Sequence, residues 1–302
     1  MIDWQERAAR VLPGIKQTAN FPMAELTTFK IGGPIDRLLE PADEAELAEV
    51  LQFAAEEELP WLVVGLGSNL LVRDKGIRGI GIRLIGKFLE WNVEGETAIS
   101  GAGVALSDLS RGTACRGLTG LEFACGIPGT VGGAVFMNAG AYDGDIAKVL
   151  TKAEAYYPGR GLAWLAAADL DFGYRHSRFQ HETAVITRAA FDLRPVNQDD
   201  ANSRITELTC QRESKQPLEW PSAGSVFRRP EGHYVGPLIE QAGLKGFRIG
   251  GAQVSPKHAG FIVNAGGATA ADVLALIDHI RKVIRVQYGV ELVPEIRVIG
   301  EE

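Results

Sequence analysis

Apolar positions recur at helical spacing in two segments of the chain. Over residues 43–58 they fall on one face, and Asp43 stands where a capping residue is expected. Over residues 270–287 a second apolar stripe follows Thr269 and Asp272, which have the spacing of a capping pair. Both segments are predicted to be helices that pack one face against a core.

Short apolar runs indicate strands. The run at 61–64 predicts a buried strand, and a second apolar stretch follows at 70–72. Alternating runs within 78–104 and 151–195 predict further strands. Between them, the pattern predicts helices over 106–116, from Val131 onward and over 201–214, and a short helix with a lead-in within 1–20. We place the major boundary of the chain near residue 200.

Composition and charge limit the function classes. The formal net charge is −7, which disfavours a nucleic-acid partner because phosphate neutralisation needs clustered Lys and Arg. Residues 212–260 hold seven basic against four acidic side chains, which is +3 and leaves −10 elsewhere. One modest basic region on an acidic protein suits a small anionic ligand, although a solvated face without function fits the charge equally well.

Several classes of protein are not expected. No apolar run is long enough for a membrane helix, and the acidic start differs from a signal peptide. The three cysteines and five histidines show no metal-ligand spacing. We therefore expect a cytoplasmic enzyme without metal or membrane partner that acts on a small molecule as a monomer or weak oligomer.

Glycine is enriched and clustered. There are 36 glycines among 302 residues, against an ordinary share of about 7%. The loop 65–69 follows a predicted strand but lacks the third glycine of a dinucleotide fingerprint, since Leu70 stands there and a turn rather than a helix follows. The densest cluster, 120–134, leads into the helix predicted from Val131, whose free backbone N–H groups could bind a phosphate or a flavin carbonyl.

Seven motifs in one order resemble the UDP-N-acetylenolpyruvoylglucosamine reductase family. They are TTFKIGGP (27–34), VGLGSNLLV (64–72), GLEFACGIPGTVGGAVFMNAGAY (120–142), FGYRHSRF (172–179), SAGSVFRRP (222–230), GLKGFRIGGAQVSPKHAGFIVN (243–264) and ELVPEIRVIG (291–300). The resemblance covers nearly the whole chain. It implies NADPH-dependent reduction of UDP-N-acetylglucosamine enolpyruvate to UDP-N-acetylmuramate through non-covalent FAD, a step of peptidoglycan precursor synthesis.

The resemblance also implies an α+β fold with a two-subdomain FAD-binding module of the vanillyl-alcohol-oxidase type and a smaller α+β substrate-binding domain. We expect FAD-binding subdomains at 1–85 and 86–202, a substrate-binding domain at 203–290 and a returning C-terminal strand at 291–302. Some members carry a tyrosine-bearing loop over the substrate. Residues 176–221 contain no tyrosine, so the chain resembles the subgroup without this loop, and the residue that covers the uridine diphosphate stays open.

Three residues match the catalytic positions of the family. Ser225 matches the proton donor, Arg175 matches the guanidinium that polarises the substrate carboxylate, and Glu295 matches an acid that orients Arg175 or assists proton transfer.

The glycine-rich loops are the expected FAD-binding segments, because backbone N–H groups suit the pyrophosphate and the flavin edge. The residues are Lys30, Ile31, Gly32, Gly33, Gly65, Leu66, Gly67, Ser68, Asn69, Gly126, Ile127, Pro128, Gly129, Thr130, Gly132 and Gly133. The expected substrate contacts in or beside the basic region are Phe227, Arg228, Lys245, His258 and Asn264.

Two rival functions remain open at this point. One is an FAD oxidase or dehydrogenase of the same fold that acts on another small substrate, and the other is a nucleotide-binding module without catalysis. The first has no reason to keep SAGSVF, FGYR and LVPE together, and the second predicts a colourless protein.

Overall fold

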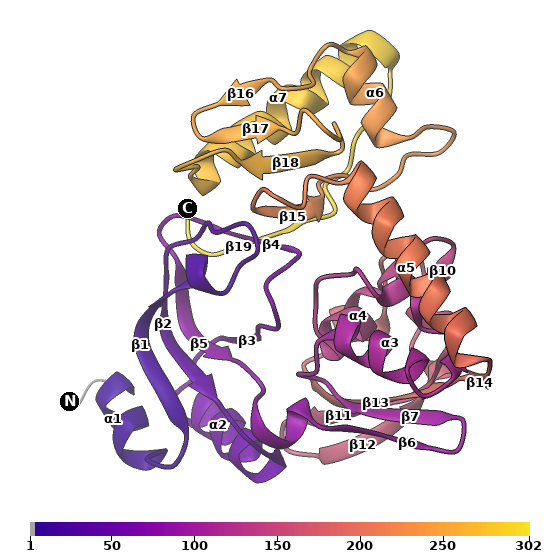
Figure 1. Cartoon of the computed structure of the whole chain (residues 1–302). Coiled ribbons are helices and arrows are strands. Elements are labelled where there is room, and N and C mark those ends of the chain that lie inside the picture. Colours follow the sequence, from indigo (N-terminus) through magenta and orange to yellow (C-terminus); the bar gives the residue numbers. More distant parts are fainter. Residues whose placement is uncertain (1–3) are drawn as a thin grey trace. The chain divides into compact units, whose positions relative to one another are not determined.

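The computed structural model describes residues 4–302, and the chain folds into two units (Figure 1). Segments of the two units alternate along the sequence. The first unit comprises Met1–Ala19, Arg37–Gly65 and Ile80–Arg212, and the second comprises Asn20–Asp36, Leu66–Gly79 and Glu213–Glu302. Each unit is described by itself below.

The first unit contains a five-stranded antiparallel sheet with the order β12-β11-β13-β7-β6. Helix α4 packs against β13 and β7. The strands are β6 (Trp91–Glu94), β7 (Thr97–Gly101), β11 (Leu150–Tyr157), β12 (Gly161–Ala166) and β13 (Val185–Asp192).

Another sheet has the order β1-β2-β5-β3, in which β3 and β5 run parallel. Its strands are β1 (Lys16–Pro22), β2 (Pro34–Glu40), β3 (Trp61–Val63) and β5 (Ile77–Ile82). The α-helices within residues 4–215 are α1 (Trp4–Val11), α2 (Glu44–Glu56), α3 (Leu106–Ala114), α4 (Val131–Met137) and α5 (Gln198–Lys215). Two-residue pairs join β8 (Leu118–Thr119) to β14 (Arg194–Pro195) and β9 (Gly140–Ala141) to β10 (Gly144–Asp145).

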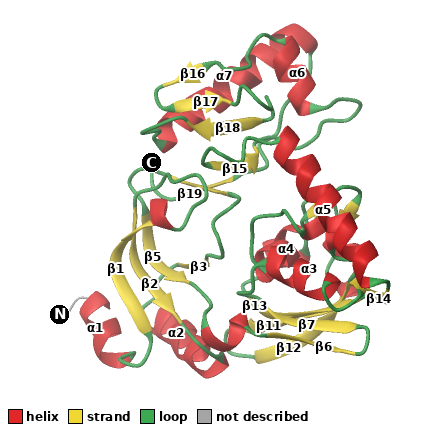
Figure 2. Cartoon of the chain, in the orientation of Figure 1, coloured by secondary structure: helices red, strands yellow, loops and turns green. Residues whose placement is uncertain are grey.

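The second unit is built on an antiparallel sheet with the order β15-β18-β17-β16. Helix α7 packs against β16 and β17 and also against α6. The elements are β15 (Ser222–Ser225), α6 (Val235–Gln241), β16 (Arg248–Ile249), β17 (Ala252–Val254), β18 (Phe261–Asn264) and α7 (Ala270–Tyr288). Strand β19 (Arg297–Ile299) pairs in parallel with β4 (Leu70–Val72). Figure 2 shows how helices and strands are distributed over these elements.

Local capping chemistry explains where two predicted helices begin. The Asp43 carboxylate accepts the N–H groups of Ala45 and Glu46 at the start of α2. Thr269 and Asp272 form a complete capping box on α7, a feature that stabilises a helix by about 1 kcal/mol. Both predicted helices are confirmed, and their apolar stripes are buried in the cores of the two units.

Most remaining elements agree with the sequence. The strand predicted at 61–64 is present as β3, but the expectation that it is buried is wrong, because β3 is an edge strand with Trp61 and Leu62 partly buried and Val63 exposed. Three further differences concern the bounds of elements. The predicted helix 106–116 ends at Ala114, and α5 is longer than the predicted 201–214. The lead-in within 1–20 contains the start of β1, a strand that is mostly exposed and so gives little apolar signal. The fold class is α+β as predicted, whereas the four-part division of the chain stays a prediction.

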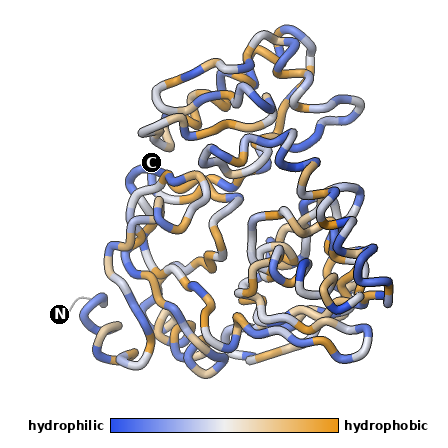
Figure 3. Tube along the Cα trace, in the orientation of Figure 1, coloured by the Kyte–Doolittle hydropathy of each residue, from blue (hydrophilic) through white to orange (hydrophobic). Residues whose placement is uncertain are grey.

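Helix α5 differs from the others in composition. Its trace is mostly blue in Figure 3 because most of its residues are polar, and only Ala201, Ile205 and Leu208 are buried. Among residues 4–302, no helix has the length and apolar character that a membrane crossing requires. Over the same residues, no group of His, Cys, Asp or Glu has the geometry of a metal site.

Candidate active site

Ser225 stands at an irregularity at the end of β15. Ser222 pairs with Val263 and Ser225 pairs with Phe261, so three steps along β15 face two steps along β18. Gly224, just before Ser225, has φ +78°, a conformation that favours glycine. Such a bulge re-aims the side chain that follows it. The Ser225 hydroxyl is partly exposed and donates to the carbonyl oxygen of Phe227 at 3.3 Å.

Glu295 lies beside Ser225 in the same unit. The Glu295 N–H donates to the carbonyl oxygen of Val226 at 2.7 Å, and the Arg228 N–H donates to the carbonyl oxygen of Val293 at 2.8 Å. The segment after Ser225 therefore runs antiparallel to the segment around Pro294. The structure thus brings two of the three predicted catalytic residues together.

Asn69 joins this arrangement from the glycine-rich loop that precedes β4. Its side-chain amide donates to the carbonyl oxygen of Glu295 at 3.3 Å, and its own carbonyl oxygen accepts the N–H of Arg297 at 2.9 Å. The loop predicted to bind FAD and the acid at 295 are therefore held to each other by direct hydrogen bonds.

The loop 27–33 is fastened to the strand that carries Ser225. The Thr28 hydroxyl donates to the carbonyl oxygen of Ser222 at 2.7 Å, although 194 residues separate them. Asn264 donates from its side-chain amide to the carbonyl oxygen of Phe29 at 3.2 Å. The buried Thr27 hydroxyl closes the loop on itself through Ile31.

The glycines of this loop are required by close packing. A Cβ on Gly32 would lie 2.7 Å from the Cβ of Val72, and a Cβ on Gly33 would lie 2.2 Å from the carbonyl oxygen of Asp74. Lys30, which precedes them, is exposed and has φ +56°. The loop therefore lies directly on β4 and the turn that follows it.

Free backbone donors occur in the neighbouring loop of the same unit. Within residues 4–302, the N–H groups of 66–69 donate no hydrogen bond. Gly67 has φ +59°, and a Cβ there would lie 2.4 Å from the carbonyl oxygen of Leu26. This run of uncommitted N–H groups on tightly packed backbone has the character of an anion-binding loop.

In the first unit, Gly65 meets Thr130 from the densest glycine cluster. A Cβ on Gly65 would lie 2.6 Å from the Thr130 hydroxyl oxygen. That hydroxyl caps α4 by accepting the N–H of Gly133 at 3.2 Å. Two segments predicted to bind FAD are thus in contact within one unit.

The start of α4 does not offer the free donors expected from the sequence. The Val131 N–H donates to Val104, the Gly132 N–H donates to Ala102, and the Gly133 N–H donates to Thr130. The expectation of several free N–H groups at this helix start is therefore wrong for these three. Two of the three acceptors, Ala102 and Val104, come from a distant segment that the local pattern does not reveal.

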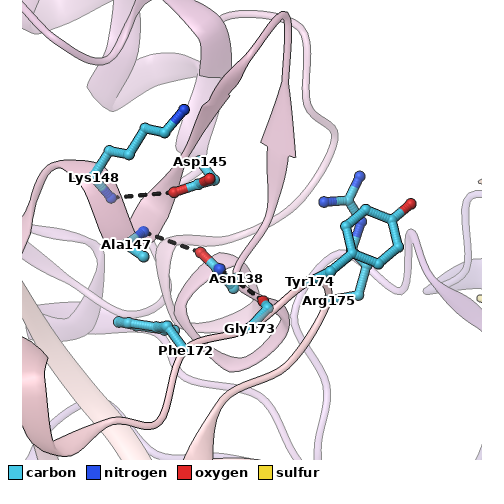
Figure 4. A pocket seen from close by; sticks show the side chains of 8 residues that line it. All are labelled: Asn138, Asp145, Ala147, Lys148, Phe172, Gly173, Tyr174 and Arg175. Carbon is cyan, nitrogen blue, oxygen red and sulfur yellow. Dashed lines mark hydrogen bonds between the residues drawn. The ribbon is translucent and has the colours of Figure 1, made fainter.

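Arg175 lies on a tight turn in the first unit. Its φ is +54°, its guanidinium donates to the carbonyl oxygen of Gly140 at 3.1 Å, and it stacks over the ring of Tyr174 at 4.9 Å. Arg175 and Tyr174 line a cavity of about 430 Å³ together with Lys148 and Asp145 (Figure 4). The cavity is therefore lined by Arg175, by Lys148, whose Nζ donates to the carbonyl oxygen of Asp143, and by the acidic Asp145. Its volume is large enough for part of a small-molecule ligand.

The end of α4 holds the Arg175 turn in place. Asn138, at φ +43°, donates to the carbonyl oxygen of Gly173 at 2.9 Å and accepts the N–H of Ala147 at 3.0 Å (Figure 4). Ser177 donates to the carbonyl oxygen of Phe136 at 2.7 Å. Asn138 was not singled out from the sequence, although the motif MNAG and its place at a helix end could have indicated a capping role.

The expected substrate residues differ in their surroundings. Phe227 is only 2% exposed and belongs to the core of the second unit, whereas Arg228 is exposed. Lys245 pairs with Glu240 at 2.8 Å. Asn264 is engaged in hydrogen bonds that shape its own loop, since its side-chain oxygen accepts the N–H groups at 266 and 268.

His258 is partly buried and already bonded. Burial lowers the pKa of its imidazole, and its Nδ1 accepts the N–H of Gly260 at 3.1 Å. The histidine is therefore biased toward the neutral form. Contact of these five residues with substrate stays a prediction.

The comparisons with known proteins agree with these observations. Residues 216–299 match the C-terminal domain of UDP-N-acetylenolpyruvoylglucosamine reductase, and residues 35–161 match an FAD binding domain. The reductase of Clostridium botulinum (strain Eklund 17B / Type B) is 47% identical over 283 residues, which cover 94% of this chain and 93% of the relative. That of Heliobacterium modesticaldum is 49% identical over 281 residues, covering 93% and 90%.

A solved structure shows the same fold. The crystal structure of UDP-N-acetylenolpyruvylglucosamine reductase from Thermus caldophilus matches with a TM-score of 0.81 and 34% identity, over 95% of this chain and 99% of that chain. Together with the sequence relatives, this match covers both units. The chain belongs to the UDP-N-acetylenolpyruvoylglucosamine reductase family.

Proposed function

We propose that this protein reduces UDP-N-acetylglucosamine enolpyruvate to UDP-N-acetylmuramate, with FAD as cofactor and NADPH as reductant, in peptidoglycan precursor synthesis. The observation that carries the proposal is the juxtaposition of Ser225 and Glu295, in a chain whose relatives named as this reductase match it over nearly their whole length. We infer that the enzyme works in the cytoplasm, as a monomer or weak oligomer.

The residues present fit FAD. The uncommitted N–H groups of 66–69 suit a pyrophosphate, and the glycines at 32, 33, 65 and 67 leave no room for a Cβ. We propose that these loops and the segment 126–133 hold the cofactor without a covalent bond. When bound, FAD supplies the two-electron transfer from NADPH to the carbon–carbon double bond of the substrate.

The protein's own contribution begins with the proton. Reduction of the enolpyruvyl double bond leaves one carbon in need of a proton, and we propose that Ser225 holds that proton on its Oγ. The bulge before Ser225 aims the hydroxyl, and the carbonyl oxygen of Phe227 fixes its rotamer. A serine hydroxyl is a weak acid, so it needs a neighbour that returns the proton quickly. We propose Glu295 for that role, because its backbone pairs with Val226, the residue that follows Ser225.

Arg175 contributes charge. We propose that its guanidinium favours the negative charge that builds up on the substrate carboxylate, which a planar fork of donors binds better than a lysine does. Its turn is held by the hydrogen bonds of Asn138, so the guanidinium starts from a fixed backbone.

The rival reading is an FAD oxidase or dehydrogenase that acts on another small substrate. The test is a two-step anaerobic experiment on the purified full chain. NADPH should bleach the visible flavin band, and the enolpyruvyl substrate should restore it with formation of UDP-N-acetylmuramate. A flavin that NADPH reduces but this substrate does not reoxidise would favour the rival, and a colourless protein that takes up no FAD would exclude both.

A further inference from the structure

The guanidinium of Arg212 lies on the glycine-rich loop of the first unit. Arg212 is carried by α5 near its C-terminal end. A Cβ on Gly126 would lie 2.5 Å from the Cδ of Arg212 and 3.2 Å from its Nε. The side chain is therefore pressed against the backbone at the start of the segment Gly126–Thr130, one of the segments expected to bind FAD.

This arginine is partly buried and has no counter-charge. Within residues 4–302, no hydrogen bond or ion pair satisfies its guanidinium. Burial lowers its pKa, and the titratable groups that face it are Tyr142 and Cys125. The Tyr142 hydroxyl is already used, because it donates to the carbonyl oxygen of Leu208 at 3.1 Å.

Two other arginines of this unit are paired with acids. Arg188 bonds Glu44 at 2.7 Å, and Arg204, eight residues before Arg212 on the same helix, bonds Glu207 at 2.5 Å. The Arg212 side chain is only partly buried, and its guanidinium nitrogens keep access to solvent. A partly desolvated guanidinium without an acidic partner has donors available for a bound anion. An anion bound beside Gly126 would accept from these donors.

The neighbouring helix cannot take this role. The first three N–H groups of α4 are already bonded within the protein. Positive charge for an anion at this loop must therefore come from a side chain, and Arg212 is the guanidinium that lies there.

We propose that Arg212 binds negatively charged acceptor atoms of FAD at the Gly126–Thr130 loop. The proposal rests on the proposed function, because it assigns a further residue to the same cofactor. Two parts of FAD have the required chemistry: the pyrophosphate, and the pyrimidine edge of the flavin, which becomes negatively charged on reduction. Both accept the planar fork of an arginine.

The experiment uses the full chain freed of flavin and then titrated with FAD and, separately, with riboflavin, which lacks the pyrophosphate. Arg212→Met keeps the stem on Gly126 and removes the charge, and Arg212→Lys keeps the charge but not the fork. Arg204→Met is the matched control on the same helix. The loss of charge-assisted hydrogen bonds should weaken FAD binding by Arg212→Met about tenfold to one-hundredfold, with Arg212→Lys in between.

Binding to the pyrophosphate and binding to the flavin edge are distinguished by the affinity for riboflavin and by the midpoint potential of the bound flavin. If the pyrophosphate is bound, riboflavin affinity and the potential stay as in the wild type. If the flavin edge is bound, riboflavin is weakened by the same factor, and the midpoint potential of the bound flavin falls.

The proposal is overturned if Arg212→Met leaves FAD affinity and potential within twofold of Arg204→Met. It is also overturned if both flavins weaken equally with unchanged potential while the flavin-free protein melts earlier, since that pattern marks a structural role. Failure of the wild-type chain to bind FAD would instead refute the proposed function.

Discussion

The backbone N–H of Glu295 donates to the carbonyl oxygen of Val226 at 2.7 Å, which pairs Glu295 with the residue that directly follows Ser225. Because this is a main-chain bond, substitution of either side chain leaves the segment pairing intact. The chemistry of the two side chains can therefore be tested separately from the fold.

Ser225→Ala should leave flavin reduction by NADPH intact and nearly abolish transfer to the enolpyruvyl substrate. A general acid contributes about 10² to 10⁴ to a rate, and the alanine has no proton to give. Stopped-flow measurement of the two half-reactions checks this prediction. If both half-reactions slowed by the same factor, Ser225 would not be the acid.

Asn138→Gly should lower turnover while the protein keeps its flavin. Glycine accepts the left-handed backbone at this position but loses the hydrogen bonds to Gly173 and Ala147, which together contribute about 1–3 kcal/mol. The turn that carries Arg175 should then be less well fixed. Steady-state kinetics beside the flavin-to-protein absorbance ratio provides the measurement.

Asn138→Ala is the matched variant for that experiment, because it removes the same bonds and adds backbone strain. It should be the less stable of the two. Unchanged turnover in Asn138→Gly would show that Arg175 does not depend on this turn.

Gly65→Ala should destabilise the protein by about 1–3 kcal/mol through overpacking against Thr130, whose hydroxyl oxygen would lie 2.6 Å from the new Cβ. Thr130→Ala alone should cost about 1 kcal/mol through the lost cap. In the double variant the clash is relieved, so the double variant should lose less unfolding free energy than the two single variants lose in sum. Urea unfolding of the four proteins measures this, and strict additivity would contradict the packing argument.

Low pH should lower the free energy of unfolding partly through protonation of Asp272. The N–H groups of Thr269 and Gly251 donate to its carboxylate and hold its pKa below the ordinary value. A carboxylate with a lowered pKa contributes stability that is present above its unfolded pKa of about 4 and is lost as the pH falls through the folded value.

The expected result for Asp272→Asn is a flatter fall of unfolding free energy below about pH 4. Asp278→Asn on the exposed side of the same helix serves as the control. Identical profiles of unfolding free energy against pH for the wild type and Asp272→Asn would show that Asp272 does not contribute to the acid sensitivity.

Residues close in sequence were enough to predict where the helices with strong caps begin. Asp43 marks the start of α2 and Thr269 marks that of α7, because each acts on residues two or three positions ahead. Strand β1 was not found, since its side chains are mostly exposed and a strand in that setting has no apolar alternation.

The candidate site was predictable in its residues but not in its connections. Ser225 and Glu295 were named from motifs, yet their adjacency depends on pairing across 69 residues of chain. Arg212 was counted only as one charge of a basic region, because nothing near it in sequence indicates that it lies on Gly126. Such relations arise from tertiary packing and are invisible to local patterns.

The alternation of segments between the two units limits how the chain can be divided for study. A fragment that begins at Glu213 carries Ser225 and Glu295 but lacks Thr28 and Asn69, which bond to that part of the second unit. No single cut in the gene yields either unit whole. Isolated-domain expression and split-protein designs will need covalent rewiring of the chain, such as fused or permuted segments, before either half can be expected to stand alone.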